Sequence, residues 1–124
     1  MNKHIVIFSS LILLFLGGCG LFDGPTICTL EFVYVSVEVT GDTLDQTYTI
    51  QTTTGDTVQQ STEYVFDQRY LVLDDGYQPE MRNREREFRF VGLKNGDIVI
   101  DELYVIKADE CHIEKVSGID TIEL

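Results

Sequence analysis

The residues that could do chemistry are few, and the most suggestive group surrounds one histidine. Glu110, His112 and Glu114 alternate along a predicted strand, which places their side chains on one face at a spacing of roughly 6.5–7 Å. Carboxylate and imidazole groups at that spacing can offer two ligands to zinc or another divalent ion. The alternative is a solvent-facing polar face of a strand. We favour that alternative because no pattern supplies a further ligand, and we predict no metal and no cofactor.

The same histidine is the one base available for nucleophilic catalysis after the first few residues. A Ser-His-Asp or Cys-His device needs His112 in that role. Its neighbour Cys111 would point to the opposite face of the predicted strand. We therefore assign no catalytic residue and predict that the protein is not an enzyme.

An arginine-rich segment is the other unusual feature. It holds four basic residues within eight positions, namely Arg82, Arg84, Arg86 and Arg89. In an extended chain the first three share one face, opposite Glu85 and Glu87. Such a stripe could meet anionic lipid headgroups, a polysaccharide or an acidic protein. The alternative, which we favour, is charge balance against acidic neighbouring strands, worth about 0.2–1 kcal/mol per exposed pair.

The start of the chain predicts export. Lys3 and His4 precede an apolar run over residues 5–16. This run is too short to cross a hydrocarbon core of roughly 30 Å at ~1.5 Å per residue, and the pattern is typical of a secretory signal peptide.

Residues 16–19, Leu-Gly-Gly-Cys, resemble the lipobox of bacterial lipoproteins, in which the cysteine is lipidated and becomes the first residue of the mature chain. The resemblance implies a signal peptide over 1–18, lipidation of Cys19 and a short tether over 19–27. Two or more acyl chains anchor a protein stably. We expect a membrane-anchored protein on the exported side, and Gly20 after the cysteine favours the outer membrane.

With Cys19 lipidated, two cysteines remain, and they form an even pair in an oxidising compartment. We predict a disulfide between Cys28 and Cys111, with two buried free thiols as the alternative. A loop near 100 residues contributes up to ~4.7 kcal/mol in the chain-entropy description.

The body, residues 28–124, is predicted to consist of strands. Valines at 33, 35, 37 and 39 alternate with polar residues, and Phe88 and Phe90 alternate with Glu87 and Arg89. Residues 63–73 fit either one strand buried on both faces or two half-strands joined by a bend. Asn95-Gly96 favours a type I′ hairpin, and we expect a bulge at Asp101-Glu102. Residues 74–79 are predicted as a turn or loop, and about seven short strands indicate an antiparallel β-sandwich.

Residues 105–116 are similar to the closing strands of carboxypeptidase-regulatory-like (transthyretin-like) domains, with Asp109, Cys111 and His112 at matching places. Cys28 before the first strand also fits that family. The resemblance implies a prealbumin-like sandwich that serves as a non-catalytic accessory or binding module.

Composition restricts the partners. The chain has 124 residues and a formal charge of −12, which allows one domain and argues against nucleic-acid binding. We expect a lipid-anchored binding or structural module of the cell envelope, with an envelope protein or polysaccharide as possible partner; its oligomeric state is left open. The alternative is an acidic inhibitor or ligand-binding lipoprotein that targets a cationic envelope protein such as a lysozyme-like enzyme.

Overall fold

The computed structural model describes residues 24–58 and 64–124. The predicted signal peptide, the predicted lipidation site Cys19 and the first part of the predicted tether lie outside these residues, as does Glu63. Within them, the chain forms eight strands, one 3-10 turn and one short helix. In order they are β1 (Tyr34–Thr40), β2 (Gln46–Gln51), β3 (Tyr64–Phe66), β4 (Arg69–Asp74), η1 (Asp75–Tyr77), α1 (Gln78–Met81), β5 (Arg84–Lys94), β6 (Asp97–Ala108), β7 (Ile113–Ser117) and β8 (Thr121–Glu123).

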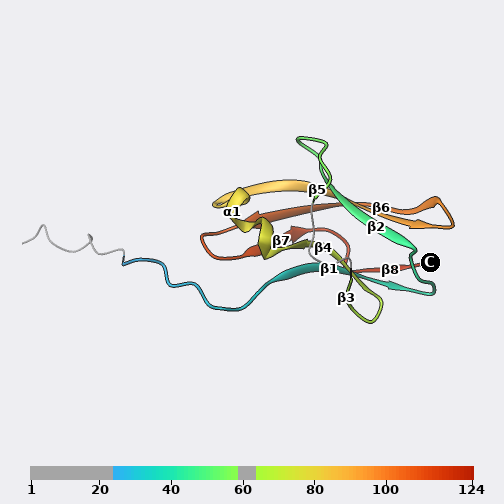
Figure 1. Ribbon diagram of the computed structural model, residues 1–124, viewed down its shortest axis with the longest axis horizontal. Helices are drawn as coiled ribbons and strands as arrows, with labels where there is room; N and C mark the ends of the chain where they lie inside the picture. Colours follow the sequence, from blue (N-terminus) through green and yellow to red (C-terminus); the bar gives the residue numbers. More distant parts are fainter. Residues whose placement is uncertain (1–23, 59–63) are drawn as a thin grey trace, which may run out of the picture.

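The strands form two sheets, which confirms the predicted all-β sandwich. One sheet has the order β3-β4-β1-β8 and the other has the order β2-β5-β6-β7. All neighbouring strands run antiparallel except β1 and β8, which are parallel. In Figure 1 the β5–β6 hairpin and the C-terminus lie at one end of the body, and the N-terminal segment leaves from the other end.

The inward faces of β1 and β5 follow the predicted period of two. Val35, Val37 and Val39 are buried, and so are Phe88 and Phe90. Alternate residues on a strand point to opposite faces, so these valines and phenylalanines meet between the sheets. They form the apolar core that fixes the register of both strands.

The inward face of β2 is polar. Thr47, Thr49 and Gln51 are buried, whereas Tyr48 and Ile50 are only half-buried. The Thr49 hydroxyl donates a 2.8 Å hydrogen bond to the carbonyl oxygen of Val72 on β4. This bond joins the two sheets and satisfies a hydroxyl that burial would otherwise leave at a cost.

The predicted hairpin turn is confirmed, and the structure distinguishes the two alternatives for the later apolar run. Asn95 and Gly96 both have positive φ, 52° and 84°, as a type I′ hairpin between β5 and β6 requires. Over the described residues 64–73, the run has the second predicted form: two strands, β3 and β4, with a turn between them at which Gln68 has a φ of 60°.

One detail of the prediction is wrong. Strand β6 continues through Asp101-Glu102, and the register shift lies opposite Gly92 and Leu93, where Val99 is the extra residue. The turn or loop predicted over residues 74–79 is the 3-10 turn η1, which the Asp74 carboxylate caps by accepting the Gly76 N–H at 2.8 Å, followed by the short helix α1 with a proline in its first turn.

Candidate functional site at the disulfide end

A disulfide joins Cys28 to Cys111, as predicted, with the two Cα atoms 5.3 Å apart and 83 positions apart in the chain. Cys28 lies in the exposed segment before β1, and Cys111 lies in the turn between β6 and β7. Figure 1 shows that this turn, α1 and the start of β5 lie at the end from which the N-terminal segment leaves the sandwich. We call this the disulfide end.

The turn that carries Cys111 is closed by Asp109. One carboxylate oxygen of Asp109 accepts the N–H groups of Cys111 at 2.7 Å and His112 at 2.8 Å. The Asp109 N–H donates to the His112 carbonyl oxygen at 3.0 Å. These two accepted bonds, from His112 first and Cys111 second, hold the pKa of Asp109 below its ordinary value of 3.8.

This turn corrects the predicted strand over residues 110–114. Strand β7 begins only at Ile113, so Glu110 and His112 do not belong to an alternating strand face. Glu110 is exposed, and Glu114 pairs with the Lys107 ammonium at 3.1 Å. His112 is drawn instead toward Asp75. The described residues contain no group of three or more acidic, histidine or cysteine side chains that could hold a metal ion.

Asp75 is the centre of the hydrogen bonding at this end. Its side chain is only 7 % exposed. One carboxylate oxygen accepts the Val33 N–H at 2.8 Å and contacts Nδ1 of His112 at 2.7 Å, and the other accepts the Ile113 N–H at 2.8 Å. The Asp75 N–H also donates to the Val33 carbonyl oxygen at 3.1 Å. Because Val33 precedes β1 and Ile113 begins β7, this one carboxylate links the two sheets.

A third side chain extends this cluster toward solvent. Nε2 of His112 lies 2.9 Å from the Thr29 hydroxyl oxygen, so Thr29, His112 and Asp75 form a hydroxyl–imidazole–carboxylate chain. That order of groups is the one by which a base activates a nucleophile. Here, however, the carboxylate is also bound by two backbone N–H groups, and neither of the two hollows described below includes any of the three residues. The arrangement favours a structural lock.

Sequence reasoning placed His112 at this end but missed both of its partners. Thr29 is 83 positions from His112 and Asp75 is 37 positions away. Neither lies in a periodic segment. The one pattern in the sequence that points to this region is the pair Asp74-Asp75. The pair indicates a turn, but it does not indicate which groups the Asp75 carboxylate binds.

The four arginines do not form one stripe. Arg89 is on the solvent face of β5 and forms a two-point ion pair with Asp101 of β6. This pair raises the pKa of Arg89 and lowers that of Asp101. Arg84 and Arg86 lie on the same face of β5 as Phe88. Arg82 precedes the strand, and its backbone forms a bridge with that of Ala108. Among the described residues, no ion pair engages Arg82, Arg84 or Arg86.

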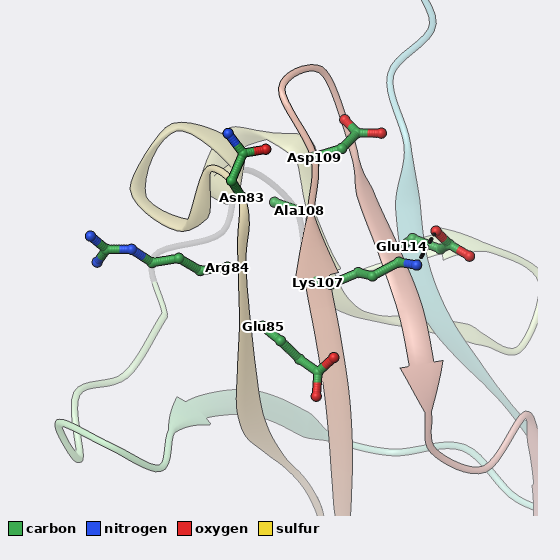
Figure 2. A pocket seen from close by; sticks show the side chains of 7 residues that line it. All are labelled: Asn83, Arg84, Glu85, Lys107, Ala108, Asp109 and Glu114. Atoms are coloured by element: carbon green, nitrogen blue, oxygen red, sulfur yellow. Dashed lines mark ion pairs between the residues drawn. The ribbon is translucent and has the colours of Figure 1, made fainter.

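A shallow hollow of about 440 Å³ lies beside these arginines at the start of β5 and the end of β6. In Figure 2, Arg84 points away from β6, and Lys107 reaches across to Glu114 of β7. The lining carries both signs of charge, with the cations Arg84 and Lys107 beside the carboxylates of Glu85, Asp109 and Glu114. A second hollow of about 320 Å³ lies between β1 and β7. Mixed charge in an open hollow does not define a ligand class.

Comparison with known proteins adds no relative: no protein-family model, curated protein or solved structure matches the chain. Among the described residues, no helix is long and apolar enough to cross a membrane.

Proposed function

We propose that this protein is a lipid-anchored module of the cell envelope that binds or organises other envelope components and performs no catalysis. The observation that carries the proposal is the use of its three cysteines. Two of them, Cys28 and Cys111, form the disulfide. The third, Cys19, directly follows the apolar leader and the two glycines that resemble a lipobox.

The position of the disulfide supports this assignment. Structural disulfides persist in exported proteins and are rare in reducing compartments. The residues after the expected anchor, 24–32, are exposed and form no regular strand or helix. From Cys19 to Cys28 the chain reaches at most about 30 Å at ~3.3 Å per residue. The sandwich is therefore held close to the bilayer, with its disulfide end toward the lipid.

The absence of catalysis is supported by the way that His112 is held. Its two ring nitrogens lie against Thr29 and Asp75, and Asp75 binds the backbone of two strands. A general base also needs a substrate within hydrogen-bond reach, and neither hollow at this end is lined by Thr29, His112 or Asp75. These contacts instead give the imidazole a role in joining the N-terminal segment to the sandwich.

The experiment is replacement of the anchor cysteine in cells. The Cys19→Ser protein is expected to lose incorporation of a labelled fatty acid and to keep its leader or leave the membrane fraction. The matched control is the double variant Cys28→Ser with Cys111→Ser, which removes two thiols but keeps Cys19, and it is expected to retain the label. Fatty-acid labelling and membrane fractionation of the Cys19→Ser variant that equal those of the unmodified protein would refute the proposal.

Crosslinking of the anchored protein in whole cells, followed by mass spectrometry, then tests the kind of partner. An association that survives high salt supports a structural role. Loss of the partner at high salt, with a cationic partner recovered at low salt, would identify the inhibitor alternative instead, since exposed charges are screened over about 8 Å at physiological ionic strength.

A further inference from the structure

We propose that the exposed segment before the sandwich inserts its apolar side chains into the headgroup and acyl boundary of the membrane, so that the disulfide end docks on the bilayer. The inference rests on the proposed lipid anchor and goes beyond it, because an anchor alone leaves the body free to move at the end of its tether. It assigns a membrane-contacting surface to four residues, Ile27, Leu30, Phe32 and Tyr34, which we call the apolar segment.

The apolar segment concentrates exposed hydrophobic surface. Ten large apolar side chains are exposed among the described residues, and four of them lie within the eight positions 27–34. Ile27 is 91 % exposed and Leu30 is fully exposed. The rings of Phe32 and Tyr34 contact each other edge-on, with centroids 5.2 Å apart. Water-exposed clusters of this kind mark a contact surface more often than isolated apolar residues do.

The core cannot take up these side chains. Val33 and Val35 face inward from the same stretch of chain, and Val33 is pinned through both its N–H and its carbonyl to Asp75. Tyr34 therefore faces away from the core because adjacent residues of a strand point to opposite faces. The disulfide fixes Cys28 near the start of the segment, directly after Ile27. The segment is held with its apolar side chains outward.

The length of chain between the segment and the anchor selects the membrane as the occupant. Five steps separate Cys19 from Gly24, the first described residue, which is about 17 Å at ~3.3 Å per residue. A short tether keeps the segment at a high effective concentration next to the lipid, so a weak insertion is enough to dock the body. Tyrosine and phenylalanine are also side chains that suit the membrane interface.

Charge at the disulfide end permits this docking without requiring an anionic membrane. Arg82 and Arg84 are exposed at this end, and no ion pair among the described residues engages them. Their guanidinium groups can meet the phosphate that every phospholipid headgroup carries. Glu31 and Glu110 lie at the same end. The apolar side chains are therefore the main contact, and insertion is expected with or without phosphatidylglycerol in the membrane.

The test uses the absence of tryptophan from this chain. The full lipidated protein carries one reporter, either Leu30→Trp in the apolar segment or Ile98→Trp at the hairpin of the far end. Both native side chains are exposed, so neither change disturbs the core. Each variant is reconstituted into phosphatidylethanolamine vesicles, with and without phosphatidylglycerol, in which part of the lipid carries bromine on its acyl chains.

Interfacial side chains lie about 5–10 Å into the headgroup and acyl boundary, so we expect the emission of Leu30→Trp to shift to shorter wavelength and to fall about twofold with brominated lipid. Ile98→Trp is expected to show neither change. Adding Ile27→Glu and Phe32→Glu to Leu30→Trp is expected to abolish the quenching, because it places two charges in the inserting surface.

Vesicle flotation separates the two proposals. If both variants float with the vesicles but Leu30→Trp is not quenched by bromine, the insertion is refuted and the anchor stands. A blue shift without bromine quenching also refutes it, and indicates that a second copy of the chain covers the segment. If neither variant floats, the anchor itself fails and both proposals fall.

Discussion

Replacing Asp75 by alanine is the most direct test of the lock at the disulfide end. The change removes the acceptor of the Val33 and Ile113 N–H groups and the partner of the His112 imidazole. Ile113 is 3 % exposed and Val33 is half-buried, so water cannot fully replace the carboxylate. An unsatisfied buried donor costs about 1–3 kcal/mol, and two of them therefore lower the free energy of unfolding by roughly 2–6 kcal/mol.

That loss is large for a domain of this size, because native domains are stable by only about 5–15 kcal/mol. The assay is urea unfolding of the oxidised domain, starting at Gly20, followed by circular dichroism. The free energy of unfolding of Asp75→Asn is expected to lie between those of Asp75→Ala and the unmodified protein. The amide oxygen of asparagine can still accept one N–H, while its NH₂ group faces a second donor. Asp97→Ala is the matched control at an exposed aspartate of the hairpin, with an expected change within about 0.5 kcal/mol.

The outcome that contradicts the reasoning is equally plain. If Asp75→Ala unfolds at the same urea concentration as Asp97→Ala, the hydrogen bonds of Asp75 do not stabilise the fold. The lock would then contribute nothing to stability, and the Thr29–His112–Asp75 chain would need another explanation, with catalysis the first to test.

Three further predictions concern the same domain. Reduction of Cys28–Cys111 opens a loop of 83 positions and is expected to lower the free energy of unfolding by up to ~4.5 kcal/mol; urea curves that coincide with and without reductant would contradict this. Gly118→Ala places a Cβ atom inside van der Waals contact with the Tyr104 ring at a φ of +132°, so we expect the free energy of unfolding to fall by about 2–4 kcal/mol in the same assay; a fall below about 1 kcal/mol would exclude the close contact. The pKa of Asp109 in the folded protein is lower than its unfolded value of 3.8, so the contribution of Asp109 to stability is present above pH 3.8 and is lost as the pH falls through the folded pKa. In Asp109→Asn, the free energy of unfolding is therefore expected to fall less steeply with decreasing pH in that range, and a pH dependence equal to that of the unmodified protein would contradict this.

The sequence predicted those elements whose inward face is apolar. Valine alternation in β1 and phenylalanine alternation in β5 match the buried faces, because burial of β-branched and aromatic side chains fixes a strand's register. It did not indicate the inward face of β2, where Thr49 is buried through a bond to Val72 of the other sheet. That partner becomes visible only once the sheets are packed.

The contacts at the disulfide end could be predicted only in part, because some depend on local sequence and others on the packing of the sheets. Counting cysteines identified Cys28 and Cys111, because the expected lipidation of Cys19 leaves an even pair and the expected compartment is oxidising. The Asp109 turn replaced a predicted strand because its carboxylate satisfies two backbone donors locally. Asp75 reaches its partners only through the packing of two loops and two sheets. No periodic pattern encodes such a contact.

The disulfide also determines how the protein responds to mechanical tension. If the protein is pulled between Cys19 and Leu124, the covalent path runs from Cys28 through the sulfur bridge to Cys111 and bypasses every residue between them. Only nine steps before the bridge and thirteen after it can then be extended, which is roughly 70 Å at ~3.3 Å per residue. Strands β1 to β6 stay outside the stretched path, and only β7 and β8 unravel. With the proposed lipid anchor at Cys19, the sandwich would thus keep most of its structure under a pull that would otherwise unfold it.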